Sequence, residues 1–383
     1  MKTLLHIGAG KCGSSALQRF LSMNPVLPLR NGGHLVYAVI LHNGDVMTGK
    51  QVHRSADGTG MQMERRPITP GLLLHKGRRL ISAAVRRNRP VLSGPQVRRR
   101  ARRTISGYVS SAPLSHISQN LSNFRVPGVG KNDVVVLSCE GWRKEFDRLK
   151  TQDALAAFGQ VDALMYVRPQ TEYINSAYWQ WGAWSDRPFD DWFAGALDDG
   201  KWARAAQAWN ACDRVNDFAV RVVPDDVVTD FLEFVGAEPS VFENLDGKRL
   251  NSGLSDTILR VMQRHRELRP SSHESYIDFV LEKHFGHLPG KPAWVLSPEH
   301  IEAIITRTRS DNETLQTLMS EDQAQAMQAD RKWWEVVAPD RKLADPGVLP
   351  PADPAADAIM AIAFAELLNF ERNRARRFAR LIA

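Results

Sequence analysis

A glycine-rich segment close to the N-terminus holds a lysine and two serines directly after a short apolar run. Residues 4–18 read LLHIGAGKCGSSALQ. Glycines let the backbone turn tightly and bring its N–H groups close to a ligand, and a helix that starts at the serines would direct its positive dipole end to the same place. The segment therefore predicts an anion-binding site. Its candidate contacts are Gly10, Lys11, Cys12, Gly13, Ser14 and Ser15.

The same segment departs from the P-loop of ATP-binding proteins. That motif needs Gly-x-x-x-x-Gly-Lys followed by Ser or Thr, whereas here Lys11 precedes Gly13 and the hydroxyl side chains follow it. The magnesium-binding arrangement of the motif is therefore not reproduced. Ser15 and Gln18 have the spacing of a capping box, which predicts that a helix begins at Ser15. The alternative is an ordinary glycine-rich turn between a strand and a helix, with Lys11 in solvent.

A second candidate segment, residues 164–180, reads LMYVRPQTEYINSAYWQ. Arg168 stands at the end of an apolar run that is typical of a buried strand, Pro169 suits the entry to a helix, and Ser176 follows within that helix. A guanidinium group offers a planar fork of donors to phosphate oxygens, and a serine hydroxyl adds one directional hydrogen bond. Alternatively, Arg168 is a surface charge at a helix entry and Ser176 is a neutral helix residue.

Short apolar runs that lead into helical patterns indicate the strands of a parallel sheet covered by helices. The predicted strands are residues 3–7, 134–138, 163–167 and 218–223. The predicted helices are residues 15–23, 171–181, 201–210 and 225–235, the last closed by Gly236. We therefore predict an α/β fold with a central, mostly parallel sheet flanked by helices, plus helical additions.

At the two candidate segments the chain resembles the sulfotransferases that use 3′-phosphoadenosine 5′-phosphosulfate (PAPS). Bacterial members often read Gly-x-x-Lys-Thr-Gly-Thr-Thr-x-x-Gln at this place, and here GAGKCGSSALQ starts at Gly8, so that serines replace the threonines and Cys12 departs from the pattern. The family also has an arginine after a strand and a serine eight positions later in a helix, as Arg168 and Ser176 stand here. Looser resemblance covers residues 134–142, 202–236 and 249–255.

The resemblance implies a P-loop-like, three-layer fold and a role for each candidate residue. Lys11 would stabilise the oxygen that leaves during sulfuryl transfer, and the backbone N–H groups around Gly13 and Ser15 would hold the 5′-phosphate. Arg168 and Ser176 would bind the 3′-phosphate. PAPS would be the sulfuryl donor and 3′,5′-adenosine bisphosphate (PAP) the product, and the reaction demands no metal.

The base that takes the proton of the acceptor hydroxyl has three candidates. Glu140 follows the strand predicted at residues 134–138, at the carboxyl end where ligands of open α/β sheets bind, and the looser resemblance also places a glutamate there. Its alternative role is to cap the next turn or to pair with a neighbouring basic residue. His34 and His42 compete, because some sulfotransferases place an acid-base residue shortly after the first helix and histidine titrates near neutrality. We predict Glu140 as the base and His34 as the second catalytic candidate.

Positive charge is concentrated in one part of the chain. The 383 residues carry a net charge of +7, yet residues 65–132 hold 15 Lys and Arg and no Asp or Glu. Pro90, Gly94 and Pro95 interrupt the densest part, residues 86–103. We expect a surface excursion that either contacts an anionic glycan or the head groups of a membrane surface, or is simply a solvated loop.

Two other classes of function compete with sulfuryl transfer. The arginine-rich stretch could bind nucleic acid, but no aromatic residues interleave with the arginines of residues 86–103 and no nucleic-acid-binding motif is found. The glycine loop could belong to a nucleotide-dependent kinase with a degenerate P-loop. We therefore predict no nucleic-acid partner. We predict a glycan or glycolipid acceptor, because six tryptophans near the second segment can stack on sugars as well as fill a core. They are Trp179, Trp181, Trp184, Trp192, Trp202 and Trp209.

The predicted organisation is a sulfotransferase domain (1–338), a proline-rich linker (339–354) and a C-terminal amphipathic helix (355–383). The terminal helix would either form a homodimer or pack on the body, and its periodicity does not separate these alternatives. Three cysteines lie far apart in sequence, which favours a reduced, cytoplasmic protein, with peripheral membrane contact through the arginine-rich stretch. The first apolar run ends at Gly8, too early for a signal peptide or a membrane span.

Overall fold

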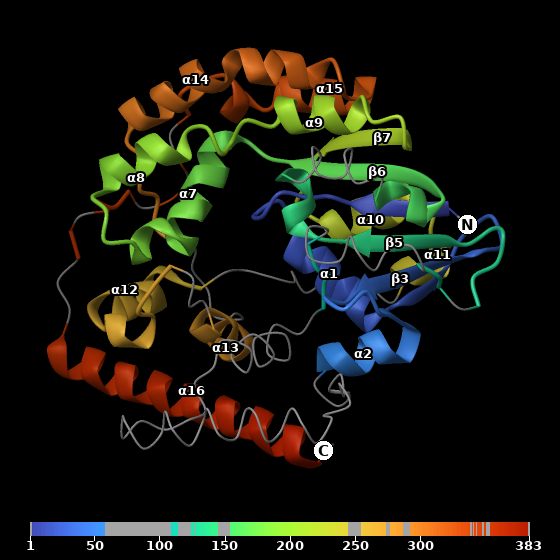
Figure 1. Ribbon diagram of the computed structural model, residues 1–383. Coiled ribbons are helices and arrows are strands. Elements are labelled where there is room, and N and C mark those ends of the chain that lie inside the picture. Colours follow the sequence, from blue (N-terminus) through green and yellow to red (C-terminus); the bar gives the residue numbers. More distant parts are fainter. Residues whose placement is uncertain are drawn as a thin grey trace, which may run out of the picture.

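The computed structural model describes most of the chain (Figure 1). The described residues are 2–57, 109–113, 124–126, 128–144, 154–243, 254–272, 276–285, 292–337, 339, 341, 343–346, 348–349 and 353–381. Most of the arginine-rich stretch predicted at residues 65–132 lies outside these ranges.

A seven-stranded sheet forms the centre of the molecule (Figure 1). Five strands run parallel in the order β3-β5-β1-β6-β7, and two short strands, β2 and β4, pair antiparallel with β3. The strands are β1 (Lys2–His6), β2 (Val26–Pro28), β3 (His34–Ile40), β4 (Val46–Thr48), β5 (Val134–Ser138), β6 (Gln160–Val167) and β7 (Val215–Val222). The predicted α/β fold with a mostly parallel sheet is confirmed.

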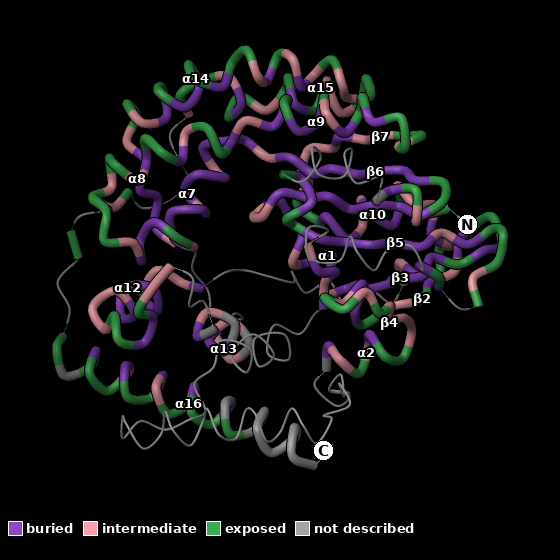
Figure 2. Tube along the Cα trace, in the orientation of Figure 1, coloured by how far each residue is buried: buried purple, intermediate pink, exposed green. Residues whose placement is uncertain are grey.

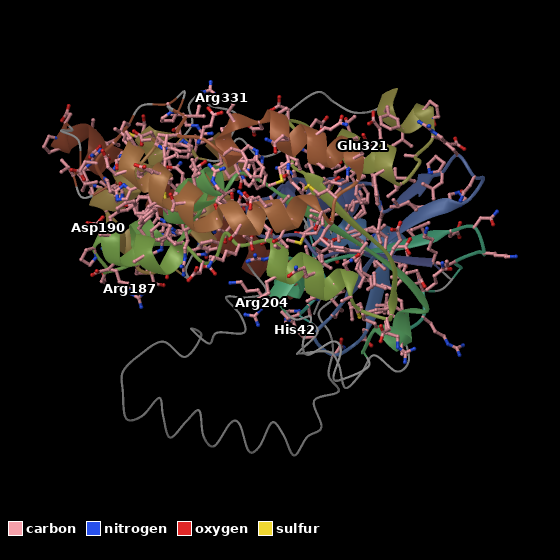
Figure 3. The ribbon with its side chains drawn as sticks, turned by 90° about the horizontal axis from the view of Figure 1, so that it is seen from above. His42, Arg187, Asp190, Arg204, Glu321 and Arg331 are labelled. Carbon is pink, nitrogen blue, oxygen red and sulfur yellow. The ribbon has the colours of Figure 1, made fainter. Side chains whose placement is uncertain are left out.

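Two groups of helices cover this sheet, some by direct contact with strands and others through neighbouring helices. The first contains α1 (Ser14–Met23), α2 (Gly49–Asp57) and α10 (Val227–Phe234), with α11 (Pro239–Glu243) following in the chain. The second contains α7 (Gln170–Gln180), α9 (Ala203–Asn210), α14 (Pro298–Gln316) and α15 (Glu321–Ala329), with α8 (Phe189–Ala196) between α7 and α9 in the chain. The chain moves one way from β1 to β3 and the other way from β6 to β7, and because β–α–β connections are as a rule right-handed, we expect the two groups on opposite faces. Seen from above, α14 extends from the side of Asp190 toward that of Glu321 (Figure 3).

The parallel strands β1, β3, β5 and β6 are buried along most of their length, whereas β7 at the edge of the sheet is mostly half-buried or exposed (Figure 2). β1, β5 and β6 lie in the interior of the sheet, and their apolar runs therefore need cover on both faces. β3 was not among the predicted strands, although its apolar run stands between the turn residues of NGG and NGD. The four strands that were predicted are all present, with ends that differ by three residues or fewer.

Three further helices form a second core away from the sheet. α12 (Asp256–Arg264), α13 (Tyr276–Phe285) and α16 (Pro354–Leu381) share this core with the end of α7 (Figure 1). Arg264 pairs with Asp357, and His284 Nε2 lies 2.9 Å from Glu371 Oε1, so that α12 and α13 are both tied to α16. We call this the helical part. Short 3-10 turns complete the described structure: η2 (Glu140–Lys144), η3 (Ala154–Phe158), η4 (Gly182–Trp184), η5 (Arg266–Leu268) and η6 (Arg331–Trp333).

The segment predicted as a linker contacts the rest of the chain where it is described. Ala344 donates its N–H to the carbonyl of Trp294, and the hydroxyl of Tyr178 donates to the carbonyl of Pro346. In α16, Phe364 is buried against the helical part, whereas Ile359, Ile362 and Phe370 are exposed. Within the described ranges, none of the helices combines the length and hydropathy needed to cross a membrane.

Candidate active site

The glycine loop, residues 8–13, lies at the carboxyl edge of the sheet. It follows β1, the central strand, and Ile7 donates its N–H to the carbonyl of Leu164 in β6 (3.0 Å). The chain leaves β1 toward β3 and leaves β6 toward β7, so that the direction of the connections reverses between these neighbouring strands. Ligands of open α/β sheets bind outside the carboxyl ends of the strands at such a point.

The start of α1 presents free backbone donors to the loop. The helix begins at Ser14 after Gly13, whose backbone is left-handed (φ 83°), and no side chain caps it. The predicted capping box is wrong, because the Ser15 hydroxyl hydrogen-bonds to Glu140 and Gln18 Nε2 donates instead to Ser138 Oγ (2.9 Å). The N–H groups of the first turn therefore remain available to an anion.

The backbone of Lys11 is strained and is held from both sides. Its φ of 67° makes it the single non-glycine residue in the left-handed region among those described. Arg168 Nη1 donates to the Lys11 carbonyl (2.9 Å), and the N–H of Cys12 donates to the carbonyl of Ala9 (3.2 Å). The Cys12 thiol is fully buried, and burial raises its pKa to about 12. The N–H of Cys12 is thus bonded and its thiol is buried, and the contact predicted for Cys12 stays a prediction.

Arg168 connects the second candidate segment to the loop. Besides the Lys11 carbonyl it binds the carboxylate of Glu172, which also pairs with Lys332 Nζ (3.0 Å). Burial opposes ionisation of Glu172, but Arg168 and Lys332 outweigh it and hold its pKa at about 2. Two cations and one carboxylate leave positive charge beside the loop. The Nε–H of Arg168 is buried and has no partner in the described part of the chain.

Trp202 holds Arg168 in place directly after the end of β6. Trp202 Nε1 donates to the carbonyl of Arg168 (3.1 Å), and the N–H of Trp202 donates to Asp311 Oδ2 (2.7 Å).

Arg143 stacks on the Trp202 ring, 4.9 Å from its centroid, and donates to the carbonyl of Asp199. Lys144 pairs with the Asp199 carboxylate. The basic residues that follow Glu140 in sequence are thus occupied elsewhere.

Glu140 faces the loop from the end of β5. A Cβ atom on Gly10 would lie 3.4 Å from Glu140 Oε2, and the Ser15 hydroxyl hydrogen-bonds to the same side chain. The Glu140 residue is exposed to solvent, although many protein atoms surround its carboxylate. The loss of bulk hydration raises the pKa of Glu140, and the charge of Lys11 and the bond from Ser15 offset part of that rise. The geometry places a carboxylate of increased basicity beside the loop lysine.

The ammonium group of Lys11 lies among several charges. Burial lowers the pKa of Lys11, and the carboxylates of Glu140, Asp278 and Glu282 oppose that effect, while Arg269 adds to it. Lys11 forms no salt bridge with another described residue. Asp278 and Glu282 belong to α13, so the helical part contributes charge to the site. The sequence prediction missed both, since nothing in their local pattern separates them from an ordinary helix surface.

The remaining predicted residues, Ser176, His34 and His42, lie in different places relative to the glycine loop. Ser176 lies in α7, partly buried, without a hydrogen bond to a described residue. His34 begins β3 at the amino edge of the sheet, opposite the loop, and pairs with Asp133 (3.5 Å). His42 follows β3 at the carboxyl edge and lies at the periphery of the drawn side chains (Figure 3). The structure therefore brings Lys11, Glu140 and Arg168 together, and His34 stays apart from them.

A buried polar network lies beneath the loop. His6 Nδ1 is 2.7 Å from Ser138 Oγ, and Gln18 Nε2 donates to the same oxygen. Burial lowers the pKa of His6 to about 4, so the ring is neutral near pH 7. A Cβ on Gly8 would lie 2.6 Å from His6 Nε2 and from Ser14 Oγ, which leaves space only for glycine there. The network fixes the loop's base from β1, β5 and α1.

Comparison of the chain with family models, with curated proteins and with solved structures finds no match in any of the three. Within the described ranges there is also no group of three or more side chains arranged to hold a metal ion.

Replacing Gly13 by alanine should strain the loop. A Cβ there would lie 3.0 Å from the Val227 side chain, and the left-handed φ disfavours any residue with a Cβ. We expect Gly13→Ala to lower the free energy of unfolding by about 1–3 kcal/mol in urea titrations. Gly195→Ala is the matched control, because nothing lies within 4 Å of its Cβ and it sits in a helix; it should raise that free energy by up to ~1 kcal/mol. Equal effects of the two variants would contradict the loop geometry.

Glu172 should make stability depend on pH in acid. Because its folded pKa of about 2 lies below its ordinary value of 4.5, the carboxylate stabilises the fold above pH 4.5, and this contribution disappears as the pH falls toward 2. We expect Glu172→Gln to cost on the order of 2 kcal/mol at pH 7 and progressively less below pH 4.5. Chemical denaturation across pH measures this. Glu302→Gln, at an exposed position of α14, should show no such difference, and a pH-independent loss in Glu172→Gln would refute the prediction.

Proposed function

We propose that the protein is a PAPS-dependent sulfotransferase that transfers a sulfuryl group to a hydroxyl of a glycan or glycolipid. The observation that carries this proposal is the hydrogen bond from Arg168 Nη1 to the carbonyl of Lys11. It joins the two segments that resemble the 5′-phosphosulfate and 3′-phosphate sites of that family, although they are separated by 157 positions in sequence.

The donor groups at the loop suit a doubly phosphorylated nucleotide. The first turn of α1, all of it described, has uncapped N–H groups and no acidic residue, and Lys11 adds a cation that forms no salt bridge with any described residue. These groups would hold the 5′-phosphate and sulfate oxygens. Arg168, whose Nε–H has no partner among the described residues, and Ser176 would hold the 3′-phosphate. PAPS would supply a sulfuryl group bonded to a phosphate oxygen.

In the proposed reaction, each nearby side chain has one task. The acceptor oxygen forms a bond to sulfur while the bond from sulfur to the bridging phosphate oxygen breaks. Lys11 stabilises the negative charge that develops on the bridging oxygen, which leaves with PAP. Glu140 accepts the proton of the acceptor hydroxyl, and its raised pKa brings it closer to the working pH of a general base. In this scheme the strained backbone of Lys11 directs the Lys11 side chain toward the bridging oxygen, and no metal ion takes part.

Removal of the loop lysine tests the proposal. Calorimetry should show that the wild-type protein binds PAP and does not bind ATP with magnesium. Lys11→Ala should lower the turnover of sulfuryl transfer from ³⁵S-labelled PAPS by on the order of 100-fold, because one preorganised donor to the leaving oxygen is lost. Lys50→Ala, at an exposed position of α2, is the control. Turnover of Lys11→Ala within a factor of two of wild type would exclude the proposed role of Lys11. Binding of ATP and magnesium instead of PAP by the wild type would exclude PAPS as the donor and would favour a kinase.

Glu140 is tested by its pH dependence. Because the base must be ionised, we expect transfer to fall as the pH drops through the raised pKa of Glu140. Glu140→Gln should bind PAP with unchanged affinity, lose most of the transfer and lose this acidic limb of the pH profile. Transfer at the wild-type rate in Glu140→Gln would remove Glu140 as the base.

A further inference from the structure

A buried histidine beneath the glycine loop has one ring nitrogen without a partner. His6 is the last residue of β1, and 1% of its surface is accessible. Its Nδ1 lies 2.7 Å from Ser138 Oγ, whereas its Nε2 has no hydrogen-bond partner among the described residues. Buried polar atoms normally have a partner, so this one needs an explanation. The proposed reaction does not use His6.

The hydrogen bonds around Ser138 assign the proton of the His6 ring. Gln18 Nε2 donates to Ser138 Oγ (2.9 Å), and among the described residues His6 Nδ1 is the group left to accept the proton of the Ser138 hydroxyl. Burial lowers the pKa of His6 to about 4, and the ring is therefore neutral near pH 7. A neutral ring that accepts at Nδ1 carries its proton on Nε2. The unpartnered atom is thus a buried N–H donor.

This donor faces the start of α1 across Gly8. A Cβ on Gly8 would lie 2.6 Å from His6 Nε2 and 2.6 Å from Ser14 Oγ, so both atoms approach one point beside the loop backbone. Ser14 is the first residue of α1, and its hydroxyl donates to the carbonyl of Ala9 (3.2 Å). The oxygen of Ser14 therefore keeps lone pairs that can accept the Nε2–H of His6.

His6 also holds the chain that leads to Glu140. Its ring binds Ser138, the last residue of β5, and its backbone carbonyl accepts the N–H of Cys139 (3.2 Å). Glu140 is the next residue in the sequence. One buried residue thus contacts the end of the strand that carries the proposed base and lies against the start of the helix that would bind the anion.

We propose that His6 is a positioning residue that donates its Nε2–H to the Ser14 hydroxyl when an anion occupies the glycine loop. This inference rests on the proposed function and adds a residue that acts through the loop, without contact to the ligand. A buried donor without a partner costs free energy, and a loop conformation that supplies the partner is favoured accordingly. His6 thereby increases the affinity of the loop for an anion and fixes Ser14 relative to Glu140.

Two substitutions separate the two ring nitrogens. The side-chain oxygen of asparagine can replace Nδ1 as the acceptor for Ser138, and the longer amide of glutamine can replace Nε2 as the donor to Ser14. In calorimetry we expect His6→Gln to bind PAP within about twofold of wild type and His6→Asn to bind it about three- to tenfold more weakly, because one neutral hydrogen bond is lost. Urea titrations check that both variants are folded. Equal affinities of the two variants, or the reverse order, overturn the inference.

A double-mutant cycle tests whether the two side chains act together. Ser14→Ala should weaken PAP binding in the wild-type background, and it should weaken binding less in the His6→Asn background, where the donor to Ser14 is already missing. Losses that simply add would show that the two residues act independently, which contradicts the proposed bond.

NMR of the wild-type protein tests the same bond without a substitution. With ¹⁵N-labelled histidine, the neutral His6 ring should carry its proton on Nε2, and this proton signal should move downfield when PAP or, separately, inorganic sulfate binds. A proton on Nδ1, or an Nε2–H signal that does not respond to an anion that binds, overturns the inference. A response to sulfate in a protein that does not bind PAP would refute the proposed function and support the role of His6. A protein that binds neither anion contradicts both.

Discussion

The hydrogen bond from Arg168 to the carbonyl of Lys11 is the contact on which the candidate site depends. Lys11 has a left-handed backbone, which a residue with a Cβ adopts only where the surroundings enforce it. Arg168 supplies that constraint from the end of the neighbouring strand, and Trp202 in turn fixes the carbonyl of Arg168. The loop conformation is therefore a product of the sheet, since β1 and β6 must be adjacent for the contact to form.

Charge divides the surroundings of Lys11 into two sides. On one side, Arg168, Lys332 and the uncapped start of α1 present positive charge and N–H donors, with Glu172 compensating only in part. On the other side, Glu140, Asp278 and Glu282 act on the charge of Lys11, and Asp278 is paired with Arg269. The proposed anionic donor matches the first of these sides. Lys11 lies where they meet, and the proposed reaction needs a group there that stabilises the leaving oxygen.

The two sides come from different parts of the chain. The side proposed to bind the anion is built from strand ends and the helix that follows β1, and the other side includes Asp278 and Glu282 of α13, which belongs to the helical part with its own core. Arg269 joins the two parts, because it binds the carbonyl of Gln180 in α7 and the carboxylate of Asp278 in α13. Removing one partner of such a buried pair leaves an uncompensated charge, so the connection is costly to break.

The sequence by itself determined the α/β fold, four of the five parallel strands and the glycine turn at Gly13, because periodicity and turn chemistry are properties of neighbouring residues. Tertiary structure decided the rest. Ser15 has the spacing of a cap, but its hydroxyl meets Glu140 from β5, and His34 begins its strand at the opposite edge of the sheet. Trp181 is exposed and the tryptophans near it are packed, although their local sequences do not distinguish them. These outcomes depend on which surfaces meet across more than a hundred residues, and no local pattern records that.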